Sequence, residues 1–384
     1  MKDLPKNRVC YICYRRFPDT NFEHYSKAVS DNGYDVTILA PLEPGQQISE
    51  IRDGRKIRRI PLPKRAKKRK SALEFVFNAV EFLNKHQFHI VHIHHTCPYF
   101  SLIRILTSQK RNFIYHITSY PISSSTFTAY KEMLKNFIQC LFMDKIIVQS
   151  EELREKLIGI RSLKRTVVVP VGFNRTIFYP VSEEKRQRLR ESISISKNQP
   201  LLVYCGVIGK FRQLHRLIQA FAKVQKVCEH AILMMIGDGA AMSEIKHLVK
   251  RLDLENKIIF KGRVPHEKVV NFIAAADIGI SYVPINANFT YNPPLKTFEY
   301  LACGLPTIAT RTESNSKIIK DGFNGVLVSD RSEDLSRSIL NLLKDKERMN
   351  MLRKNSIKSI MAFDFNCITK KFLIPLYESL LRTN

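Results

Sequence analysis

Short apolar runs alternate with longer amphipathic stretches along almost the whole chain of 384 residues. The runs have the length and β-branched content of buried strands, and the stretches between them carry apolar residues at helical spacing. In the first half, this pattern predicts helices over Phe22–Asn32 and Ser150–Leu157 and strands over Val9–Tyr14, Val36–Ala40, Ile57–Pro61, Ile90–His94, Phe113–Ile117, Lys145–Gln149 and Val167–Val171. The pattern restarts at Leu201 and continues through the second half. Such alternation is typical of an α/β protein with parallel sheets.

The chain is too long for one ordinary hydrophobic core, which indicates two domains. A polar, charged segment over residues 179–199 separates the two blocks of strands and helices. We therefore expect a Rossmann-like domain over residues 1–178, a connector over 179–199, a second Rossmann-like domain over 200–360 and a C-terminal helix over 361–384. In sheets of this kind ligands bind beyond the carboxyl ends of the strands, so the cleft between two facing domains is the expected site.

Composition indicates a folded, soluble protein, with 44% hydrophobic and 25% charged residues. The longest apolar runs are far shorter than the ~20 residues that span a bilayer, and the N-terminus lacks the apolar segment of a signal peptide. These features predict a cytoplasmic protein. Cys10 and Cys13 form a lone C-x-x-C within a predicted strand, where we expect buried, reduced thiols.

The net charge of +27 is unevenly distributed, because residues 52–70 hold eleven Lys and Arg against one Asp. Residues 71–83 follow with apolar side chains at helical spacing. A polybasic run beside an amphipathic helix predicts contact with an anionic membrane surface, through Lys64, Arg65, Lys67, Lys68, Arg69 and Lys70. Two alternatives remain, a solvated basic loop before a core helix and a nucleic-acid site.

A single carboxylate, Glu299, lies within an otherwise apolar helix predicted over Thr297–Cys303. Gly304 is the expected left-handed stop of that helix. An ionised acid in an apolar setting needs a partner, which here would be a lysine, backbone donors or the hydroxyls of a ligand. Lys296, one turn earlier, could pair with Glu299 or stand beside the backbone amides at the helix start, where a phosphate is favoured.

The segment from Pro293 to Gly325 resembles the nucleotide-binding signature of retaining GT-B glycosyltransferases of the family 4 group, glycosyl transferases group 1. Further matches follow in the order of that family: FHIVHIHH, DKIIVQSEELREKL, VVVPVGFNRTIFYP, YCGVIGKFRQLHRLIQAF, MMIGDGA and KIIFKGRVPHEKVVNFIAAADIGI. The resemblance implies the GT-B fold, with two facing Rossmann-like domains and a C-terminal helix that crosses back to the first. It also implies a UDP- or GDP-linked sugar as donor, with no cofactor. No D-x-D motif stands near a strand end, so we expect no metal requirement.

The resemblance also implies roles for residues of the second half. Glu299 would take the nucleotide ribose, and Arg212 stands where the family usually has a lysine that grips the phosphates. Lys210 would share that role, because Val207 replaces the usual arginine. Tyr291 replaces the first acid of the signature, which normally touches the transferred sugar. We assign donor binding to Gly206, Gly262, Arg263, Val264, Tyr291, Asn292, Leu295, Lys296 and Glu299, and catalysis to Lys210, Arg212, Glu299 and His94.

The first half is expected to bind the acceptor, although its match to the family is looser. Phe22 lies at the start of the first helix, and His94 follows a strand as the best candidate for a cleft histidine. The family often has another histidine at the position of Thr118. His116 shares a strand face with Thr118, so either side chain could reach the cleft.

These features predict a retaining glycosyltransferase on the inner face of the cell membrane. Its acceptor would be a glycan or a lipid-linked molecule, as in surface-glycan assembly, and the leaving phosphate would take the acceptor's proton. The departures at Val207, Tyr291 and Thr118 favour an alternative, a catalytically silent subunit that binds a nucleotide sugar. A nucleic-acid protein is the third reading, but the basic run lacks interleaved aromatic residues.

Overall fold

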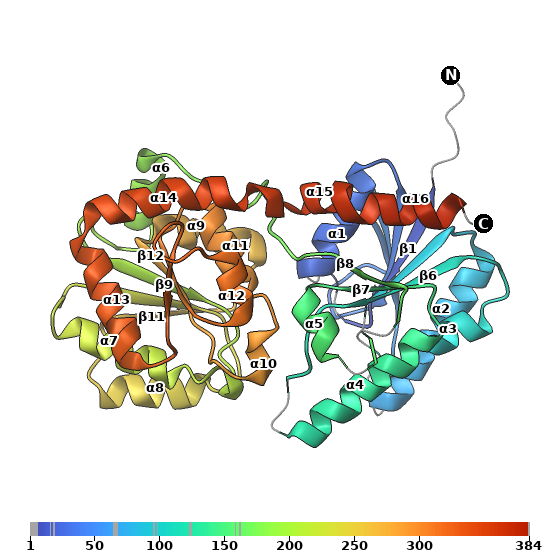
Figure 1. The fold of residues 1–384 in the computed structure, drawn as a ribbon, viewed down its shortest axis with the longest axis horizontal. Helices are drawn as coiled ribbons and strands as arrows, with labels where there is room; N and C mark the ends of the chain where they lie inside the picture. Colours follow the sequence, from blue (N-terminus) through green and yellow to red (C-terminus); the bar gives the residue numbers. More distant parts are fainter. Residues whose placement is uncertain are drawn as a thin grey trace. The chain divides into compact units, whose positions relative to one another are not determined.

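A computed structural model of the chain describes residues 7–15, 17, 20–63, 68–94, 97, 99–122, 125–157, 159–160 and 163–382. The chain divides into two compact units (Figure 1). The first unit combines Met1–Val171 with Phe365–Asn384, and the second unit is Gly172–Asp364. The first unit is therefore built from two pieces of chain that are far apart in the sequence.

The first unit contains an eight-stranded sheet in the order β3-β4-β2-β1-β5-β6-β7-β8. The strands are β1 (Arg8–Ile12), β2 (Asp35–Pro41), β3 (Ser49–Arg52), β4 (Arg55–Ile60), β5 (Ile90–His94), β6 (Asn112–Ile117), β7 (Lys145–Val148) and β8 (Thr166–Val168). All pair in parallel except β3, which is antiparallel to β4. The seven predicted strands are present, with ends shifted by up to three residues.

The edge strand β3 was not predicted. It forms a hairpin with β4 through Asp53 and Gly54, whose φ angles are 48° and 75°. Positive φ at both central residues is the geometry of the tight hairpin turn that Asp-Gly favours. The signal was therefore present in the sequence, but the short strand has no apolar run because half of its residues are exposed.

The helices of the first unit are α1 (Thr20–Asp31), α2 (Lys68–Lys85), α3 (Ser101–Leu106), α4 (Thr126–Leu141), α5 (Glu151–Lys156), α15 (Phe365–Ile368) and α16 (Ile374–Arg382), with a π-helical turn over Thr369–Leu373. Helix α2 packs its apolar face into the core, where Phe75, Val76, Ala79 and Leu83 are buried. The helix that follows the basic run is thus part of the core. This agrees with the alternative in which the run is a solvated loop that precedes a core helix.

The basic run itself is only partly described. Lys64, Arg65 and Lys67 lie outside the described residues, and the side chain of Lys68 is also outside them. Arg69 and Lys70 are exposed at the start of α2. The predicted membrane contact of this run therefore stays a prediction.

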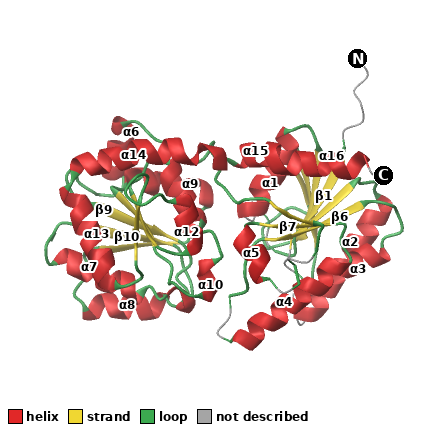
Figure 2. Cartoon of the chain, in the orientation of Figure 1, coloured by secondary structure: helices red, strands yellow, loops and turns green. Residues whose placement is uncertain are grey.

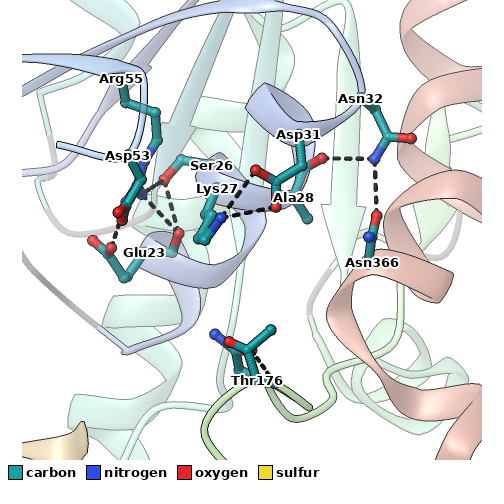
Figure 3. A network of polar contacts seen from close by, with 11 residues as sticks. Glu23, Ser26, Lys27, Ala28, Asp31, Asn32, Asp53, Arg55, Thr176 and Asn366 are labelled. Carbon is teal, nitrogen blue, oxygen red and sulfur yellow. Dashed lines mark hydrogen bonds and ion pairs between the residues drawn. The ribbon is translucent and has the colours of Figure 1, made fainter.

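Polar contacts fix helix α1 at both ends. The guanidinium of Arg55 is buried and donates to the Glu23 carboxylate at 2.6 Å and to the Ser26 hydroxyl at 2.9 Å (Figure 3). At the other end, the Asn32 side-chain amide donates to the Asn366 side-chain oxygen at 3.0 Å. Helix α1 is thus held between the β3–β4 hairpin and the C-terminal segment.

The second unit contains a six-stranded parallel sheet in the order β11-β10-β9-β12-β13-β14. Its strands are β9 (Leu201–Cys205), β10 (Ile232–Ile236), β11 (Ile258–Gly262), β12 (Ile278–Ser281), β13 (Thr307–Thr310) and β14 (Val326–Val328). Helices pack around the sheet (Figure 2). They are α6 (Glu183–Glu191), α7 (His215–Gln225), α8 (Met242–Arg251), α9 (His266–Ala275), α10 (Ala287–Thr290), α11 (Leu295–Ala302), α12 (Glu313–Ile318), α13 (Ser332–Lys344) and α14 (Lys346–Ile360), with 3-10 turns over Lys210–Arg212 and Met361–Phe363. The predicted α/β architecture with parallel sheets is confirmed.

Residues 179–199 are not a separate connector. They contain helix α6 and belong to the second unit. Within them Arg190 is buried and donates to the Ala275 carbonyl at 2.8 Å and to the Asp277 carboxylate at 3.2 Å. The charged residues that suggested a connector are partly neutralised by Asp277, which the local sequence could not show.

Candidate functional site

The centre of the second sheet has the geometry of a ligand site. Strands β9 and β12 are neighbours there, while the strands that follow each of them lie on opposite sides. Loops that leave the carboxyl ends of such a pair diverge, and ligands bind in the crevice between them. Gly206 follows β9 and Tyr282 follows β12, so the predicted donor residues around Gly206 lie at this position.

Two glycines allow the strand ends to approach each other closely. Gly206 and Gly237 have φ angles of +146° and +135°, and the Gly206 amide donates to the Ile236 carbonyl at 2.9 Å. A Cβ atom on Gly237 would lie 1.9 Å from the Gly206 carbonyl oxygen. A side chain at Gly237 is therefore excluded by both space and backbone conformation.

Lys296 lies at the start of α11 and is buried. Its Nζ donates to the Tyr282 carbonyl at 2.8 Å and stands 3.9 Å from the centre of the Tyr204 ring. Burial, with the nearby positive charge of Arg212, holds the pKa of Lys296 well below its ordinary value. The sequence left two roles open for Lys296, an ion pair with Glu299 and a position beside the backbone amides at the helix start. The structure shows no ion pair between Lys296 and Glu299, because the Lys296 amine points toward the end of β12.

Arg212 ends a 3-10 turn over Lys210–Arg212 after β9. Its guanidinium lies 4.3 Å from the centre of the Phe289 ring, which holds it by a cation–π contact. The hydroxyl of Tyr204 is buried nearby with no hydrogen-bond partner among the described residues. Arg212 and Lys296 thus place two positive charges near each other, which is a costly arrangement that a bound anion would relieve. Lys210, in the same turn, is exposed.

The hydrogen-bond partner of Glu299 is His266, which the sequence analysis did not predict. One carboxylate oxygen of Glu299 lies 2.7 Å from Nε2 of His266, at the start of α9. Burial alone would lower the pKa of His266, but the hydrogen bond and charge of Glu299, with the charge of Glu267, raise it overall. The two residues are 33 positions apart, and no local pattern links them.

Hydrogen bonds fix the helix that carries Lys296 and Glu299. The Thr297 hydroxyl lies 2.6 Å from the Ser281 hydroxyl at the end of β12, and it donates to the Asn315 side chain at 2.9 Å. The Tyr300 hydroxyl accepts from the Cys205 amide at the end of β9, at 2.8 Å. Helix α11 is thereby tied to both central strands.

The remaining predicted donor residues surround this cluster less closely. Tyr291 and Asn292 lie between α10 and α11, partly exposed, and the Asn292 amide donates to the Phe289 carbonyl at 3.2 Å. Gly262 has a φ of +66°, and its carbonyl accepts from the Gly237 amide at 2.8 Å. Three more predicted residues lie in the loop after β11 or at the start of α11, namely Arg263, Val264 and Leu295.

In the first unit, Phe22, His94 and Thr118 come together beyond the central strands β1 and β5. His94 Nε2 lies 3.0 Å from the Thr118 hydroxyl, and the Phe22 ring stacks on His94 at 5.0 Å between ring centres. His94 Nδ1 is 3.6 Å from the Cys13 thiol. Two of the three predicted acceptor-side residues, Phe22 and Thr118, thus lie in one cluster with His94, which was assigned to catalysis.

His116 lies apart from that cluster, although it shares a strand with Thr118. It is fully buried, and its Nδ1 is 3.2 Å from Nε2 of His92. The Nδ1 of His92 is in turn 2.6 Å from the Tyr377 hydroxyl, which lies 2.8 Å from the Tyr11 hydroxyl. Burial lowers the pKa of His92 to about 3. His92 was not predicted, although the alternation in H-I-H puts it on the same face as His94.

Within the described part of the chain, no group of three His, Cys, Asp or Glu side chains is placed to hold a metal ion. The same residues contain no helix long and apolar enough to cross a bilayer.

Two family models match the chain, one in each half. Residues 185–359 match the model described as glycosyl transferases group 1, and residues 22–176 match glycosyltransferase family 4. Both matches contain residues of the clusters described above.

Curated relatives share low but extended sequence similarity. Alpha-monoglucosyldiacylglycerol synthase of Acholeplasma laidlawii is 22% identical over 349 residues, which cover 84% of each chain. The protein of the same name from Streptococcus pneumoniae is 24% identical over 68% of this chain and 55% of its own length. With N-acetyl-alpha-D-glucosaminyl L-malate synthase of Bacillus anthracis, identity is 27% over 45% of this chain and 44% of the relative. The match therefore spans only about half the length of some of these relatives.

Solved structures share the fold over nearly the whole chain. Sucrose-phosphate synthase from Thermosynechococcus elongatus superposes with a TM-score of 0.80 at 18% identity, covering 99% of this chain and 100% of that one. The Anabaena protein HepE in complex with UDP-glucose superposes with a TM-score of 0.76 at 16% identity, covering 97% and 99%.

Proposed function

Because the chain is a glycosyltransferase of the group 1 and family 4 type with the GT-B fold, we propose that it transfers a sugar, with retention, from a nucleotide diphosphate to an acceptor at a membrane surface. The donor is a UDP- or GDP-linked sugar, and the acceptor is a lipid-linked molecule or glycan in surface-glycan assembly. The protein acts on the inner face of the cell membrane.

The observation that carries this proposal is the cation pair at the centre of the second sheet. Arg212 and the buried Lys296 stand beside the start of α11, where backbone amides without intrahelical partners and the helix dipole favour negative charge. A diphosphate placed there would receive charge stabilisation as it leaves the sugar. The HepE structures with UDP and with UDP-glucose support a nucleotide sugar as ligand.

The Glu299–His266 pair provides the acceptor atoms for ribose hydroxyls. A carboxylate held by one hydrogen bond at 2.7 Å keeps further lone pairs for two neighbouring hydroxyls. His266 fixes the orientation of that carboxylate, so we assign it the role of a positioning residue.

The transfer needs no nucleophile from the protein. The acceptor hydroxyl oxygen forms the new bond to the anomeric carbon on the face from which the nucleoside diphosphate departs. As the bond between the anomeric carbon and the phosphate oxygen breaks, that oxygen takes the acceptor's proton. Arg212 and Lys296 stabilise the negative charge on the departing diphosphate, and the remaining contribution is positioning.

The acceptor side rests on the cluster of Phe22, His94 and Thr118 in the first unit. His94 offers a hydrogen-bonding ring beside an aromatic surface, a combination that suits a hydroxyl-bearing ligand. The relatives named as monoglucosyldiacylglycerol synthases support a lipid acceptor.

The test is donor turnover by the purified protein, with and without anionic vesicles that contain diacylglycerol. We expect nucleotide release from one UDP- or GDP-sugar, lowered at least about 100-fold in Arg212→Ala and Glu299→Ala. The matched controls are Arg251→Ala and Glu255→Ala, which change exposed residues outside the cluster. The anomeric coupling constant of the product by NMR tests retention.

The second candidate is a silent nucleotide-sugar-binding subunit, which the departure at Tyr291 favours. It predicts calorimetric binding of a nucleotide sugar that weakens in the same two variants, with no release in any acceptor mixture. No binding of any nucleotide sugar would contradict both candidates.

A further inference from the structure

Helix α4 and its C-terminal cap residue carry a stripe of exposed apolar side chains along one face. The stripe consists of Phe127, Tyr130, Leu134, Ile138, Leu141 and Phe142, each between 40% and 64% exposed. From Phe127 to Leu141 the members follow one another at intervals of three or four residues, and so they share one side of the helix. We call this set the α4 stripe.

The opposite face of α4 already supplies the core. Ala129, Met133 and Cys140 are buried, and Met133 and Cys140 belong to the hydrophobic core of the first unit. A helix that is apolar on both faces normally has both faces covered. Helix α4 is an outer helix of its unit (Figure 1), and the α4 stripe lies away from the face of the helix that is buried.

Positive charges border the α4 stripe. Lys131 and Lys135 are exposed beside it, and the Lys131 amine lies 4.3 Å from the centre of the Phe127 ring. The one acid of the helix, Glu132, is paired with Lys135 at 2.6 Å. Lysines beside an apolar face can lay their stems along it and extend their amines to phosphate groups. The net charge of +27 adds attraction to any anionic surface.

The size of the α4 stripe favours a lipid surface over a protein partner. At 1.5 Å per residue and about 10 Å across, its face covers roughly 200 Å². A standard protein interface buries about 800 Å² on each side. A bilayer needs no matched surface, because an amphipathic helix lies in the interface with its apolar side chains among the acyl chains.

We propose that the α4 stripe is the bilayer-contacting surface of this protein, and that it binds membranes rich in anionic phospholipid. The helix lies in the plane of the interface with Lys131 and Lys135 at the level of the headgroups. The proposal rests on the membrane location in the proposed function and names the surface that makes the contact. Binding to vesicles requires neither donor nor turnover, so the two proposals can fail separately. It also differs from the sequence-based expectation, which placed the contact at residues 64–70.

An introduced tryptophan would be the only tryptophan fluorophore of the protein, because the chain contains none. Phe127→Trp introduces a single fluorophore in the α4 stripe. Phe77→Trp is the matched control, since Phe77 is an exposed aromatic on α2, the helix that follows the basic run. With vesicles of phosphatidylglycerol and phosphatidylcholine, we expect a blue shift and quenching by brominated lipid for Phe127→Trp, and neither effect for Phe77→Trp.

A pair of variants then measures the contribution of the α4 stripe to binding. Leu134→Gln with Ile138→Gln should lower vesicle partitioning at least about tenfold, because two apolar side chains are lost from the acyl region. Val227→Gln with Met351→Gln changes two exposed apolar residues of the second unit and should leave partitioning unchanged. UDP binding without vesicles should be equal in both double variants, which separates this proposal from that of the function.

Three outcomes would overturn the proposal. The first is unchanged partitioning of the Leu134→Gln/Ile138→Gln variant. The second is a lipid signal at Phe77→Trp but not at Phe127→Trp, which would place the contact at the basic run. The third is a dimer in sedimentation velocity that this double variant converts to monomer, with no vesicle binding by either form, which would make a second copy of the chain the partner.

Discussion

The carboxylate of Glu299 lies 2.7 Å from Nε2 of His266, and this contact joins the helix of the predicted ribose site to the start of α9. Glu299 is 6% exposed, so few groups other than His266 and a ligand can satisfy it. The pair therefore links protonation of one histidine to stability and, in the proposed function, to donor binding.

Replacement of His266 should make stability less dependent on pH. The pKa of His266 is raised in the folded protein, so its stabilising effect is complete below the ordinary histidine value of about 6.5 and is lost as the pH rises through the folded value. We expect His266→Gln to lower the free energy of unfolding by roughly 1–2 kcal/mol at pH 6, and by less at pH 8. Chemical denaturation across this range is the measurement, and His247→Gln, which changes an exposed residue of α8, is the control. An equal loss of stability at both pH values would contradict a contribution from the charge of His266.

Lys296 should be more important for binding than for stability. Its lowered pKa means that burial of the charged amine opposes folding, most strongly below the folded pKa and less as the pH rises through it. Lys296→Met removes that opposition but leaves the Tyr282 carbonyl without its donor, so we expect a net stability change below about 1 kcal/mol.

Binding of UDP to Lys296→Met should be at least about tenfold weaker, since a charge-assisted contact to phosphate is lost. Calorimetry and thermal unfolding on the same sample separate the two effects. Unchanged UDP affinity would remove Lys296 from the phosphate site.

Gly237→Ala should disrupt the second unit severely. The added Cβ would lie 1.9 Å from the Gly206 carbonyl oxygen, at a residue with φ of +135°, and we expect a loss of more than about 3 kcal/mol. Gly322→Ala is a matched control, because its φ is +76° but nothing lies within 4 Å of the added atom. It should lose only about 1–2 kcal/mol. Similar losses in the two variants would show that space at Gly237 is not limiting.

Tyr377→Phe should loosen the C-terminal helix of the first unit. The Tyr377 hydroxyl is buried between the Tyr11 hydroxyl at 2.8 Å and His92 Nδ1 at 2.6 Å, so its removal leaves both partners unsatisfied. We expect a loss of about 1–3 kcal/mol, seen as faster hydrogen exchange in α16. Tyr179→Phe, at an exposed hydroxyl of the second unit, should change neither quantity.

The buried His92 adds a pH dependence of its own. The pKa of His92 falls to about 3 in the folded protein. Between about pH 3 and about pH 6.5, His92 is therefore protonated in the unfolded chain but neutral in the folded chain. Stability should therefore decrease as the pH falls through this window. Unfolding of His92→Gln should show a smaller decrease from pH 6.5 to pH 4, and an equal decrease would assign the acid sensitivity to other groups.

Much of the fold could be predicted because burial on both faces leaves few sequence choices for a central strand. Ile90–His94 was predicted with its observed ends for this reason, whereas Ser49–Arg52 at the sheet edge was missed because it alternates with exposed residues. Gly304, expected to stop a helix, has a φ of +68° directly after α11 and its cap.

The site could be predicted only in part, because its contacts join distant segments. Glu299 could be recognised as needing a partner, but nothing near it indicates His266. Lys296 was correctly placed at a helix start, yet its contact with Tyr282 depends on the order of β9 and β12 in the sheet. The α4 stripe has the same residue types and spacing as a core face, so the sequence cannot distinguish it from one.

The composition of the first unit from two distant pieces of chain dictates an order of assembly during synthesis. The second unit is one continuous segment, Gly172–Asp364, and it can fold while the ribosome still holds the end of the chain. The first unit begins earlier but is completed later, because Tyr377 and the Leu380 carbonyl, which accepts from the Asn112 side chain, are synthesised after the whole second unit. The unit whose strands are translated first is thus completed after the other unit, and the apolar surface that α15 and α16 bury stays exposed to aggregation in the meantime.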